Sequence, residues 1–374
     1  MKEDKKKVFI KNFGCQMNVR DSEIILGMLK ERGYAQARSE EDADVILFNT
    51  CSVRQHAENR VWSNIGRLRG NTKTIGIVGC MAQNYKEEIF RRLPHVDLVC
   101  GPANIYDIPD LLEKTIKDKA QVLAVDRSSR PLYNDGCGFR LDTAGAFVSI
   151  MYGCNNFCSY CIVPFVRGRE RSRPLKHILD EVSALAQKGY KEITLLGQNV
   201  NSYGKDLRGK INFAKLLEKL DRINAGVRIG FMTSHPKDAS LQLFRAIRDL
   251  PSVSKHLHLP LQSGSDKILR LMNRGYTLAD YFKLVDSLRR LVPNVNLTTD
   301  IIVGFPGETK SDFNKTYQAM RKIRFDAAFI FKYSPRPKTK AAELEDCLPQ
   351  KEKQRRNNSL LKLQRRIPCY GKKT

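Results

Sequence analysis

The sequence predicts an α/β protein with two domains, an N-terminal doubly wound parallel sheet and then an incomplete barrel of about six strand–helix units. Two observations lead to this prediction. Apolar strand patterns alternate with helical periodicity along most of the chain, and polar and glycine residues gather where the expected strands end. The 374 residues are enough for two or three domains with cores of their own.

Three strands are expected in the N-terminal domain. The first, KVFIKNFGC (7–15), precedes a helix at SEIILGMLKERGY, for which Ser22 is the predicted cap and Gly33 the predicted stop. The next two strands are DADVILFNTC (42–51) and KTIGIVGC (73–80), and each is followed by a helical segment. This alternation favours a parallel sheet with helices on both faces.

The predicted boundaries follow from composition. We expect the N-terminal domain at 1–120, a linker at 121–145 that is rich in Gly, Asp, Ser and Asn, the second domain at 146–367 and a short tail at 368–374. The second domain holds six expected strands, separated mostly by helical stretches: AFVSIMYGC, EITLLGQNV, VRIGFMTSHP, HLHLPLQSGS, LTTDIIVGFPGET and AAFIFKYSPRP. In barrels of this kind, active sites lie where the strands end.

Each of the three N-terminal strands ends in a cysteine: Cys15, Cys51 and Cys80. Ligands of doubly wound sheets bind beyond the carboxyl ends of the strands, so these cysteines are expected to converge on one edge. The alternative is that all three are simply buried, because free cysteine is often a core residue.

Charge suggests a partner class. The formal net charge is +25, from 65 Lys and Arg against 40 Asp and Glu. A strongly basic protein attracts polyanions, so RNA or DNA is the expected partner, although a basic surface also serves solubility. No apolar stretch is long enough for a membrane helix and the N-terminus lacks a signal sequence, so we expect no membrane association and a cytoplasmic location.

A second group of cysteines has a distinctive spacing. Cys154, Cys158 and Cys161 form C-x-x-x-C-x-x-C after the first barrel strand. Structural zinc sites are closed by four ligands, whereas three thiolates leave one metal position open for chemistry. A zinc site would need a fourth ligand, and the closest histidine is His177.

This spacing resembles that of the radical S-adenosylmethionine (SAM) superfamily. The chain also contains the motifs NFGCQMN, NTCSVR, VGCMAQ, YGCNNFCSYCIVPFVRGRERSRP, LLGQNVNSYG, TSHP, LHLPLQSGSD and DIIVGFPGET. With these motifs, nearly the whole chain, from about residue 8 to about residue 367, resembles the methylthiotransferase family within that superfamily. The branch that it most resembles converts N(6)-isopentenyladenosine, beside the tRNA anticodon, to its 2-methylthio form.

The resemblance implies two 4Fe-4S clusters and two SAM molecules per turnover. Cys154, Cys158 and Cys161 would hold the SAM-cleaving cluster. Cys15, Cys51 and Cys80 would hold an auxiliary cluster, at which a sulfur species binds. An aromatic C2–H offers little to acid–base groups, so a cofactor-borne radical would do the hard step. The implied partners are tRNA, an electron donor such as flavodoxin or ferredoxin, and a sulfur source.

The resemblance also implies contacts with SAM. The expected cofactor-binding residues are Tyr160, Gln198, Asn199, Gln262, Ser263, Asp300 and Gly304. Three arginines, Arg167, Arg169 and Arg173, follow the cysteine loop, and they are expected to hold the SAM carboxylate, to bind RNA phosphate, or to form ion pairs with Glu170 and Asp180. His235 is either a polar contact in the site or a structural histidine.

The C-terminus departs from the family pattern. Its members carry a small RNA-binding β-barrel after the core, and we expect this domain to be absent here, because only PCYGKKT follows LLKLQRRI. The basic stretch QKEKQRRNNSLLKLQRRI is then either a replacement RNA contact or an ordinary charged helix.

Two other functions are open at this point. One is methylthiolation of threonylcarbamoyladenosine in tRNA or of a ribosomal protein, and the other is a non-catalytic iron–sulfur RNA-binding protein. The sequence assigns no role to the remaining cysteines, which are Cys100, Cys137, Cys347 and Cys369.

Overall fold

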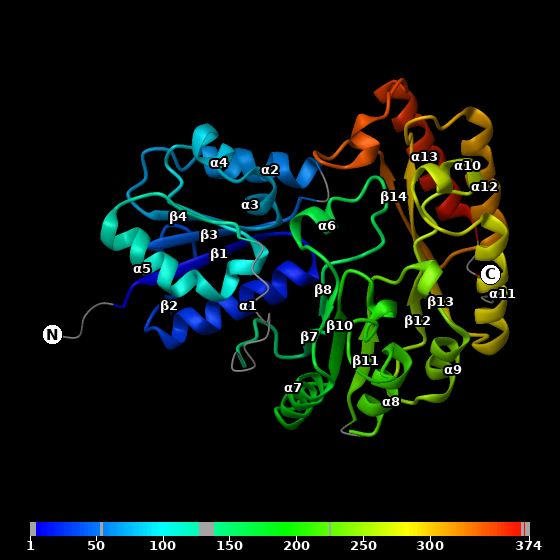
Figure 1. Ribbon diagram of the computed structural model, residues 1–374, viewed down its shortest axis with the longest axis horizontal. Helices are drawn as coiled ribbons and strands as arrows, with labels where there is room; N and C mark the ends of the chain where they lie inside the picture. The colour runs from blue at the N-terminus through cyan, green and yellow to red at the C-terminus, as the bar shows by residue number, and fades with distance from the viewer. Residues whose placement is uncertain (1–4, 53–54, 127–137, 224–225, 368–369, 371–374) are drawn as a thin grey trace. The chain divides into compact units, whose positions relative to one another are not determined.

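The computed structural model describes residues 5–52, 55–126, 138–223, 226–367 and 370. It contains two compact units (Figure 1). The N-terminal unit runs to Thr143 and also includes Ile162–Arg169, and the C-terminal unit comprises Ala144–Cys161 and the chain from Glu170 onward. Of the cysteines without a sequence-based role, Cys137 and Cys369 lie outside the described residues.

The N-terminal unit is built on a six-stranded parallel sheet of order β2-β1-β3-β4-β5-β6. Its strands are β1 (Lys7–Phe13), β2 (Ala35–Gln36), β3 (Val45–Thr50), β4 (Thr74–Gly79), β5 (Leu98–Cys100) and β6 (Val122–Ala124). Its helices are α1 (Gln16–Glu31), α2 (Gln55–Gly66), α3 (Cys80–Tyr85), α4 (Glu88–Arg92), the 3-10 helix η1 (Pro102–Asp107), α5 (Ile108–Asp118) and α6 (Val163–Val166).

Helices cover both faces of this sheet, as the sequence predicts (Figure 1). Helices α1 and α5 pack on one face and α2, α3 and α4 on the other. The three expected strands are β1, β3 and β4. The other three are only two or three residues long, too short for a periodic pattern, and β6 lies inside the segment 121–145 that the sequence predicts as a linker.

Helix α1 begins earlier than predicted. Its N-cap is Cys15 rather than Ser22, because Cys15 has an extended backbone and its N–H donates to the side chain of Asn18 at 3.2 Å. The predicted stop is confirmed, since Gly33 follows the helix with a left-handed φ of +86°.

The C-terminal unit contains the six predicted strands, all parallel, in two three-stranded sheets of order β11-β10-β7 and β12-β13-β14. These are β7 (Gly145–Ser149), β10 (Glu192–Leu196), β11 (Arg228–Phe231), β12 (His256–His258), β13 (Asn296–Val303) and β14 (Ala327–Lys332), with a small antiparallel pair of β8 (Met151–Tyr152) and β9 (Arg171–Ser172). The helices are α7 (Leu175–Gln187), α8 (Phe213–Asp221), α9 (Leu241–Asp249), α10 (Asp266–Leu271), α11 (Leu278–Leu291), α12 (Lys310–Ile323) and α13 (Gln350–Arg366), with the 3-10 helices η2 (Val200–Ser202), η3 (Pro236–Asp238) and η4 (Lys340–Glu343).

Alternate residues of these strands form one core with the helices, for example Val148, Leu195, Ile229 and Leu297. This leaves the opposite strand faces for polar residues. Among the described residues, no helix has the length and apolar character needed to cross a membrane.

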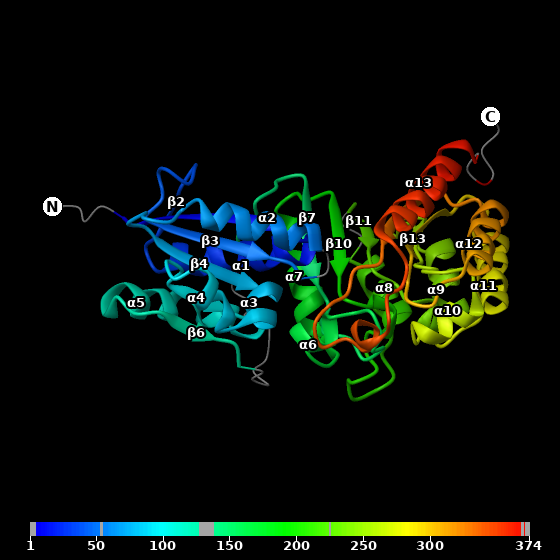
Figure 2. The same ribbon diagram turned by 90° about the horizontal axis from the view of Figure 1, so that it is seen from above.

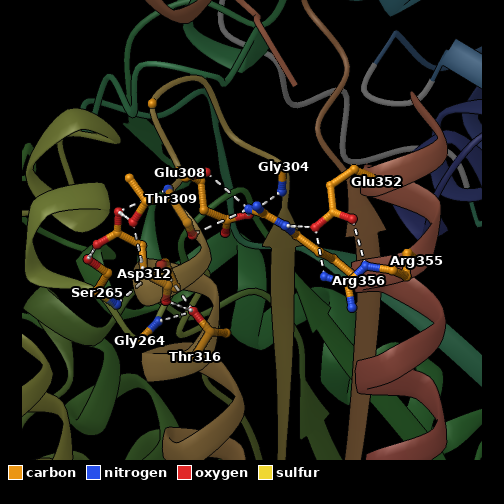
Figure 3. Close-up of polar contacts among 12 residues, drawn as sticks. Gly264, Ser265, Gly304, Glu308, Thr309, Asp312, Thr316, Glu352, Arg355 and Arg356 are labelled. Carbon is orange, nitrogen blue, oxygen red and sulfur yellow. Dashed lines mark hydrogen bonds and ion pairs between the residues drawn. The ribbon is translucent and has the colours of Figure 1, made fainter. Parts of the chain in front are cut away.

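The basic C-terminal stretch is the helix α13, which packs against β14 and α12. Figure 2 shows this helix in red near α12. One face of it is buried, because Leu360 and Leu363 join the core and the Asn357 side chain donates to the carbonyl of Ile330 at 2.8 Å. Arg356 pairs with Glu308 in the turn after β13 (Figure 3). The buried half of this helix is therefore committed to the fold.

Candidate functional site: two cysteine triads

The cysteines of the N-terminal unit lie at one edge of its sheet. Strands β1, β3 and β4 are neighbours, and their last residues, Phe13, Thr50 and Gly79, are paired in register. The N-terminal triad, Cys15, Cys51 and Cys80, follows these three strand ends. Cys51 and Cys80 are buried, whereas Cys15 is exposed. The predicted convergence is thus a consequence of strand order and register.

Buried asparagines tie the three strand ends together. The Asn18 amide donates to Asn49 Oδ1 at 2.8 Å and to the carbonyl of Thr50 at 3.1 Å. In return, Asn49 Nδ2 donates to the carbonyl of Asn18 at 2.8 Å and to the Ser22 hydroxyl at 2.9 Å. Because Asn18 also accepts the N–H of Cys15, this network fixes the turn that carries Cys15 against the strand that carries Cys51.

Gly79 is required by the same packing. Its φ is +94°, and a Cβ atom there would lie 2.7 Å from the carbonyl oxygen of Thr50 and 2.8 Å from Asn49 Oδ1. Only glycine accepts both the conformation and the close approach. The glycine before Cys80 therefore lets strand β4 end beside its neighbour.

A buried arginine, Arg167, reaches the N-terminal triad. Arg167 Nε donates to Cys80 Sγ at 3.3 Å, and its Nη2 pairs with Asp21 Oδ2 at 2.7 Å. Arg167 and Asp21 are both buried, so the alternative of a surface ion pair at Arg167 is wrong. Burial raises the pKa of the Cys80 thiol, and the charge of Arg167 opposes that rise.

The other two arginines of this run differ. Arg173 is buried and pairs with Glu181 at 2.7 Å. Arg169 is exposed.

The C-terminal unit carries the second group, Cys154, Cys158 and Cys161, here named the core triad. Its loop is held by backbone hydrogen bonds: Ser159 N–H donates to the carbonyl of Met272 at 3.0 Å, and Asn273 Nδ2 donates to that of Phe157 at 3.0 Å. The N–H of Cys161 donates to the carbonyl of Cys158 at 2.9 Å. The turn after α10 thus fixes the loop.

Two nitrogen groups face Cys158. Arg274 Nη1 donates to Cys158 Sγ at 3.3 Å and lies 3.4 Å from the Tyr160 hydroxyl. His235 Nε2 lies 3.9 Å from the same sulfur, and its Nδ1 accepts the N–H of Lys237 at 3.2 Å, which places the imidazole proton on Nε2. Burial and the nearby Arg274 charge lower the pKa of His235 to about 2, so it is neutral near pH 7. Burial also raises the pKa of Cys154 to about 11.

Of the predicted SAM-binding residues, Gln198 and Asn199 follow β10, Gln262 and Ser263 follow β12, and Gly304 follows β13, whereas Asp300 lies inside β13 and Tyr160 on the cysteine loop. Gln198 Oε1 accepts the N–H of Gly153, just before Cys154, at 2.5 Å. Asn199 donates to Asp238 at 2.7 Å, while its buried Oδ1 has no partner. Gln262 has a φ of +68°, and its buried Oε1 is likewise without a partner. Orphaned buried acceptors such as these are suited to a ligand that donates hydrogen bonds.

The other predicted SAM-binding residues, Ser263, Asp300 and Gly304, are in the same unit. Ser263 is fully buried, and its hydroxyl lies 3.4 Å from that of Thr316. Asp300 pairs with His258 Nε2 at 3.4 Å. Gly304 has a φ of +70° and donates its N–H to Glu308 at 2.7 Å.

Both triads offer the chemistry that an iron–sulfur cluster needs. Over the described parts of the chain, no three His, Cys, Asp or Glu side chains gather closely enough to hold a single metal ion. A 4Fe-4S cluster makes a different demand, since its ligands are cysteine thiolates distributed over several irons. None of these six cysteines is in a disulfide, and each triad has a buried N–H donor to one sulfur. The residues fit such a group.

Comparison with known proteins is decisive for the family. A family model described as Radical SAM superfamily matches residues 148–320, and one described as Uncharacterized protein family UPF0004 matches residues 7–101. The tRNA-2-methylthio-N(6)-dimethylallyladenosine synthase of Pelotomaculum thermopropionicum is 49% identical over 370 residues, which are 97% of this chain and 83% of that protein. That of Caldicellulosiruptor saccharolyticus is 50% identical over 94% of this chain and 76% of its own length.

The chain belongs to the tRNA-2-methylthio-N(6)-dimethylallyladenosine synthase family. Its radical SAM region implies that the synthase binds SAM and a 4Fe-4S cluster. Solved structures support the fold. The radical SAM methyltransferase TsrM from Kitasatospora setae gives a TM-score of 0.64 at 14% identity, over 90% of this chain and 75% of that one. The cobalamin-dependent SAM radical enzyme OxsB gives 0.61 at 13%, over 94% and 56%.

Sequence reasoning missed four residues around the cysteines: Arg274 and Asn18, which hydrogen-bond to Cys158 and Cys15, and Asp21 and Asn49, which hold Arg167 and Asn18. The two asparagines lie inside motifs that carry the family resemblance, so a signal was present but no role was attached to it. Asp21 and Arg274 have no local signature, because their partners are distant in sequence.

Proposed function

We propose that this protein adds a methylthio group to C2 of N(6)-isopentenyladenosine at tRNA position 37. The observation that carries the proposal is that one cysteine triad follows three neighbouring parallel strand ends and a second lies on the loop after β8, in a chain of this synthase family. Three protein ligands leave one iron of each cluster open, which chemistry at the metal requires.

The core triad would hold the cluster at which SAM binds, and the N-terminal triad would hold an auxiliary cluster that takes a sulfur species. When bound, these groups supply the electron for reductive SAM cleavage and an iron site for the sulfur, with two SAM molecules used per turnover. Tyr160, the orphaned acceptors of Asn199 and Gln262, and Gln198 would orient SAM beside the core triad. Ser263, Asp300 and Gly304 would complete that cofactor site.

The partners follow from the reaction. The proposed substrate is tRNA, for which the net charge of +25 provides long-range attraction, and the proposed location is the cytoplasm. An electron donor such as flavodoxin or ferredoxin and a source of sulfur complete the set. We assign the auxiliary cluster to an N-terminal domain at about 1–120 and SAM chemistry to the segment at about 146–367.

The test is mass spectrometry of tRNA nucleosides from a host that lacks its own methylthiotransferase and expresses this chain. We expect 2-methylthio-isopentenyladenosine to appear with the wild type and not with Cys158→Ala. A methylthio product on threonylcarbamoyladenosine or on a ribosomal protein would instead identify a different substrate. A protein loaded with iron and sulfide that cleaves no SAM would be a non-catalytic RNA-binding protein and would refute the proposal.

A further inference from the structure

Each cysteine triad is contacted by one buried arginine from outside its own cysteine motif. In the N-terminal unit, Arg167 donates to Cys80 Sγ at 3.3 Å. In the C-terminal unit, Arg274 donates to Cys158 Sγ, also at 3.3 Å. Arg167 is 8% exposed and Arg274 is 4% exposed, so neither guanidinium is free to turn into solvent.

Other groups fix each guanidinium in place. Asp21, which is 2% exposed, accepts from Arg167 at 2.7 Å. Arg274 donates from Nη2 to the carbonyl of Pro260 at 3.0 Å and from Nε to the Tyr276 hydroxyl at 3.1 Å. Because these contacts use the other nitrogens of each fork, one N–H remains directed at the sulfur.

A hydrogen bond from a buried cation to a ligating thiolate changes the reduction potential of an iron–sulfur cluster. Hydrogen bonds to the sulfurs, net charge and solvent exposure set cluster reduction potentials over a wide range. The reduced cluster carries one more negative charge than the oxidised one, so a fixed positive charge nearby stabilises the reduced form more. Loss of the arginine should therefore lower the potential of that cluster.

We propose that Arg167 and Arg274 are positioning residues that set the reduction potentials of the two clusters separately, Arg167 for the auxiliary cluster and Arg274 for the SAM-cleaving cluster. This rests on the proposed assignment of a cluster to each triad. Arg167 lies six residues after Cys161, so one short segment carries a ligand of the core triad and the arginine of the N-terminal triad.

The test isolates each cluster before it is measured. The auxiliary cluster is studied alone in a Cys154→Ala, Cys158→Ala, Cys161→Ala background, and the SAM-cleaving cluster alone when the N-terminal triad is changed to alanine. Arg167→Met, Arg167→Lys, Arg274→Met and Arg274→Lys are reconstituted anaerobically in each background. Iron and sulfide are counted, and the midpoint potential is read from a redox titration followed by electron paramagnetic resonance.

We expect each Met variant to lower the midpoint potential of its own cluster by about 59 mV. For one electron, this corresponds to a reduced-to-oxidised ratio that is about tenfold lower at a fixed potential. The other cluster should be unchanged, and the Lys variants, which keep the charge but lose the fork, should shift less. Arg169→Met is the matched control, because Arg169 is exposed and lies two residues after Arg167. It should leave both potentials unchanged.

Three results would overturn the inference. The first is a loaded Met variant with an unchanged potential, and the second is an equal shift of both clusters by one arginine. The third is failure of both the Met and the Lys variant to load iron, because the arginine would then be needed for assembly alone. A wild-type protein that binds no second cluster would instead defeat the proposed function, so the two failures are distinguishable.

Discussion

Glu308 and Arg356 form a buried ion pair in which Nη1 lies 2.6 Å from Oε2 (Figure 3). Glu308 is in the turn after β13, and Arg356 is on α13. The same carboxylate oxygen accepts the N–H of Gly304 at 2.7 Å, and the Nε of Arg356 donates to Glu352 at 2.9 Å. The C-terminal helix therefore holds the turn in which the sequence places a SAM contact.

Replacing Arg356 with Met should destabilise the C-terminal unit by about 3–5 kcal/mol, because it leaves the Glu308 carboxylate buried without its partner. Adding Glu308→Gln should recover part of the loss. Circular dichroism during urea unfolding measures the effect, while the single tryptophan, Trp62, reports on the N-terminal unit and should be unaffected. Arg355→Met is the control, since Arg355 is exposed and bonded to Glu352. A similar loss in that variant would contradict the prediction.

The two triads should separate by function. Changing Cys15, Cys51 or Cys80 to alanine should abolish methylthiolation but retain SAM cleavage, because those residues would hold only the auxiliary cluster. Alanine at any member of the core triad should abolish both. Formation of 5′-deoxyadenosine and of modified nucleoside, assayed on the same samples, measures the two activities. Equal loss of SAM cleavage in both groups would refute this division.

Gly79→Ala should disrupt the N-terminal triad, because the added methyl group meets the Thr50 carbonyl and the backbone has a positive φ. Strain of this kind costs about 1–3 kcal/mol, and relieving it would move Cys80. We expect about half of the iron to be lost on reconstitution, with the core triad still loaded. Gly66→Ala is the matched control, since nothing lies within 4 Å of a Cβ at Gly66. Full iron content in Gly79→Ala would show that the strand end tolerates the shift.

The free energy of unfolding of the C-terminal unit should decrease in acid, because the Asp312 carboxylate becomes protonated. Burial favours a higher pKa for this carboxyl, but hydrogen bonds from Ser265 at 2.6 Å and from the Thr309 hydroxyl at 2.7 Å lower its pKa to about 2. Because the folded pKa lies below the unfolded one, the contribution is present above about pH 4 and is lost as the pH falls toward 2.

Urea unfolding of the cluster-free protein between pH 5 and pH 3 tests this for Asp312. The wild type should be more stable than Asp312→Asn at pH 5, and the difference should shrink as the pH falls. Asp280→Asn is the comparison, because Asp280 is exposed but forms the equivalent capping box on α11, and hydrogen bonds from Thr277 also lower its pKa. Its stability difference should shrink in acid too, but be smaller. A stability difference at Asp312 that is constant with pH would contradict the assignment.

The sequence by itself determined the parts of this protein that depend on local pattern. Strand and helix periodicity predicted the six strands of the C-terminal unit and the longer strands of the N-terminal sheet. The spacing of Cys154, Cys158 and Cys161 indicated an open metal site, and cysteines at three successive strand ends indicated a second one. These features are visible because each strand pattern, with the cysteine that ends it, and the spacing of the second cysteine group are local in the chain.

Tertiary structure alone decided which distant side chains complete each site. Arg167 meets Cys80 and Asp21 across 87 and 146 positions of sequence, and Arg274 meets Cys158 across 116. An arginine in a basic segment looks the same in sequence whether it is exposed or buried. Only the fold removes water from the guanidinium. Without water, the hydrogen bond from a single N–H to a cysteine sulfur is electrostatically stronger than it would be at the surface.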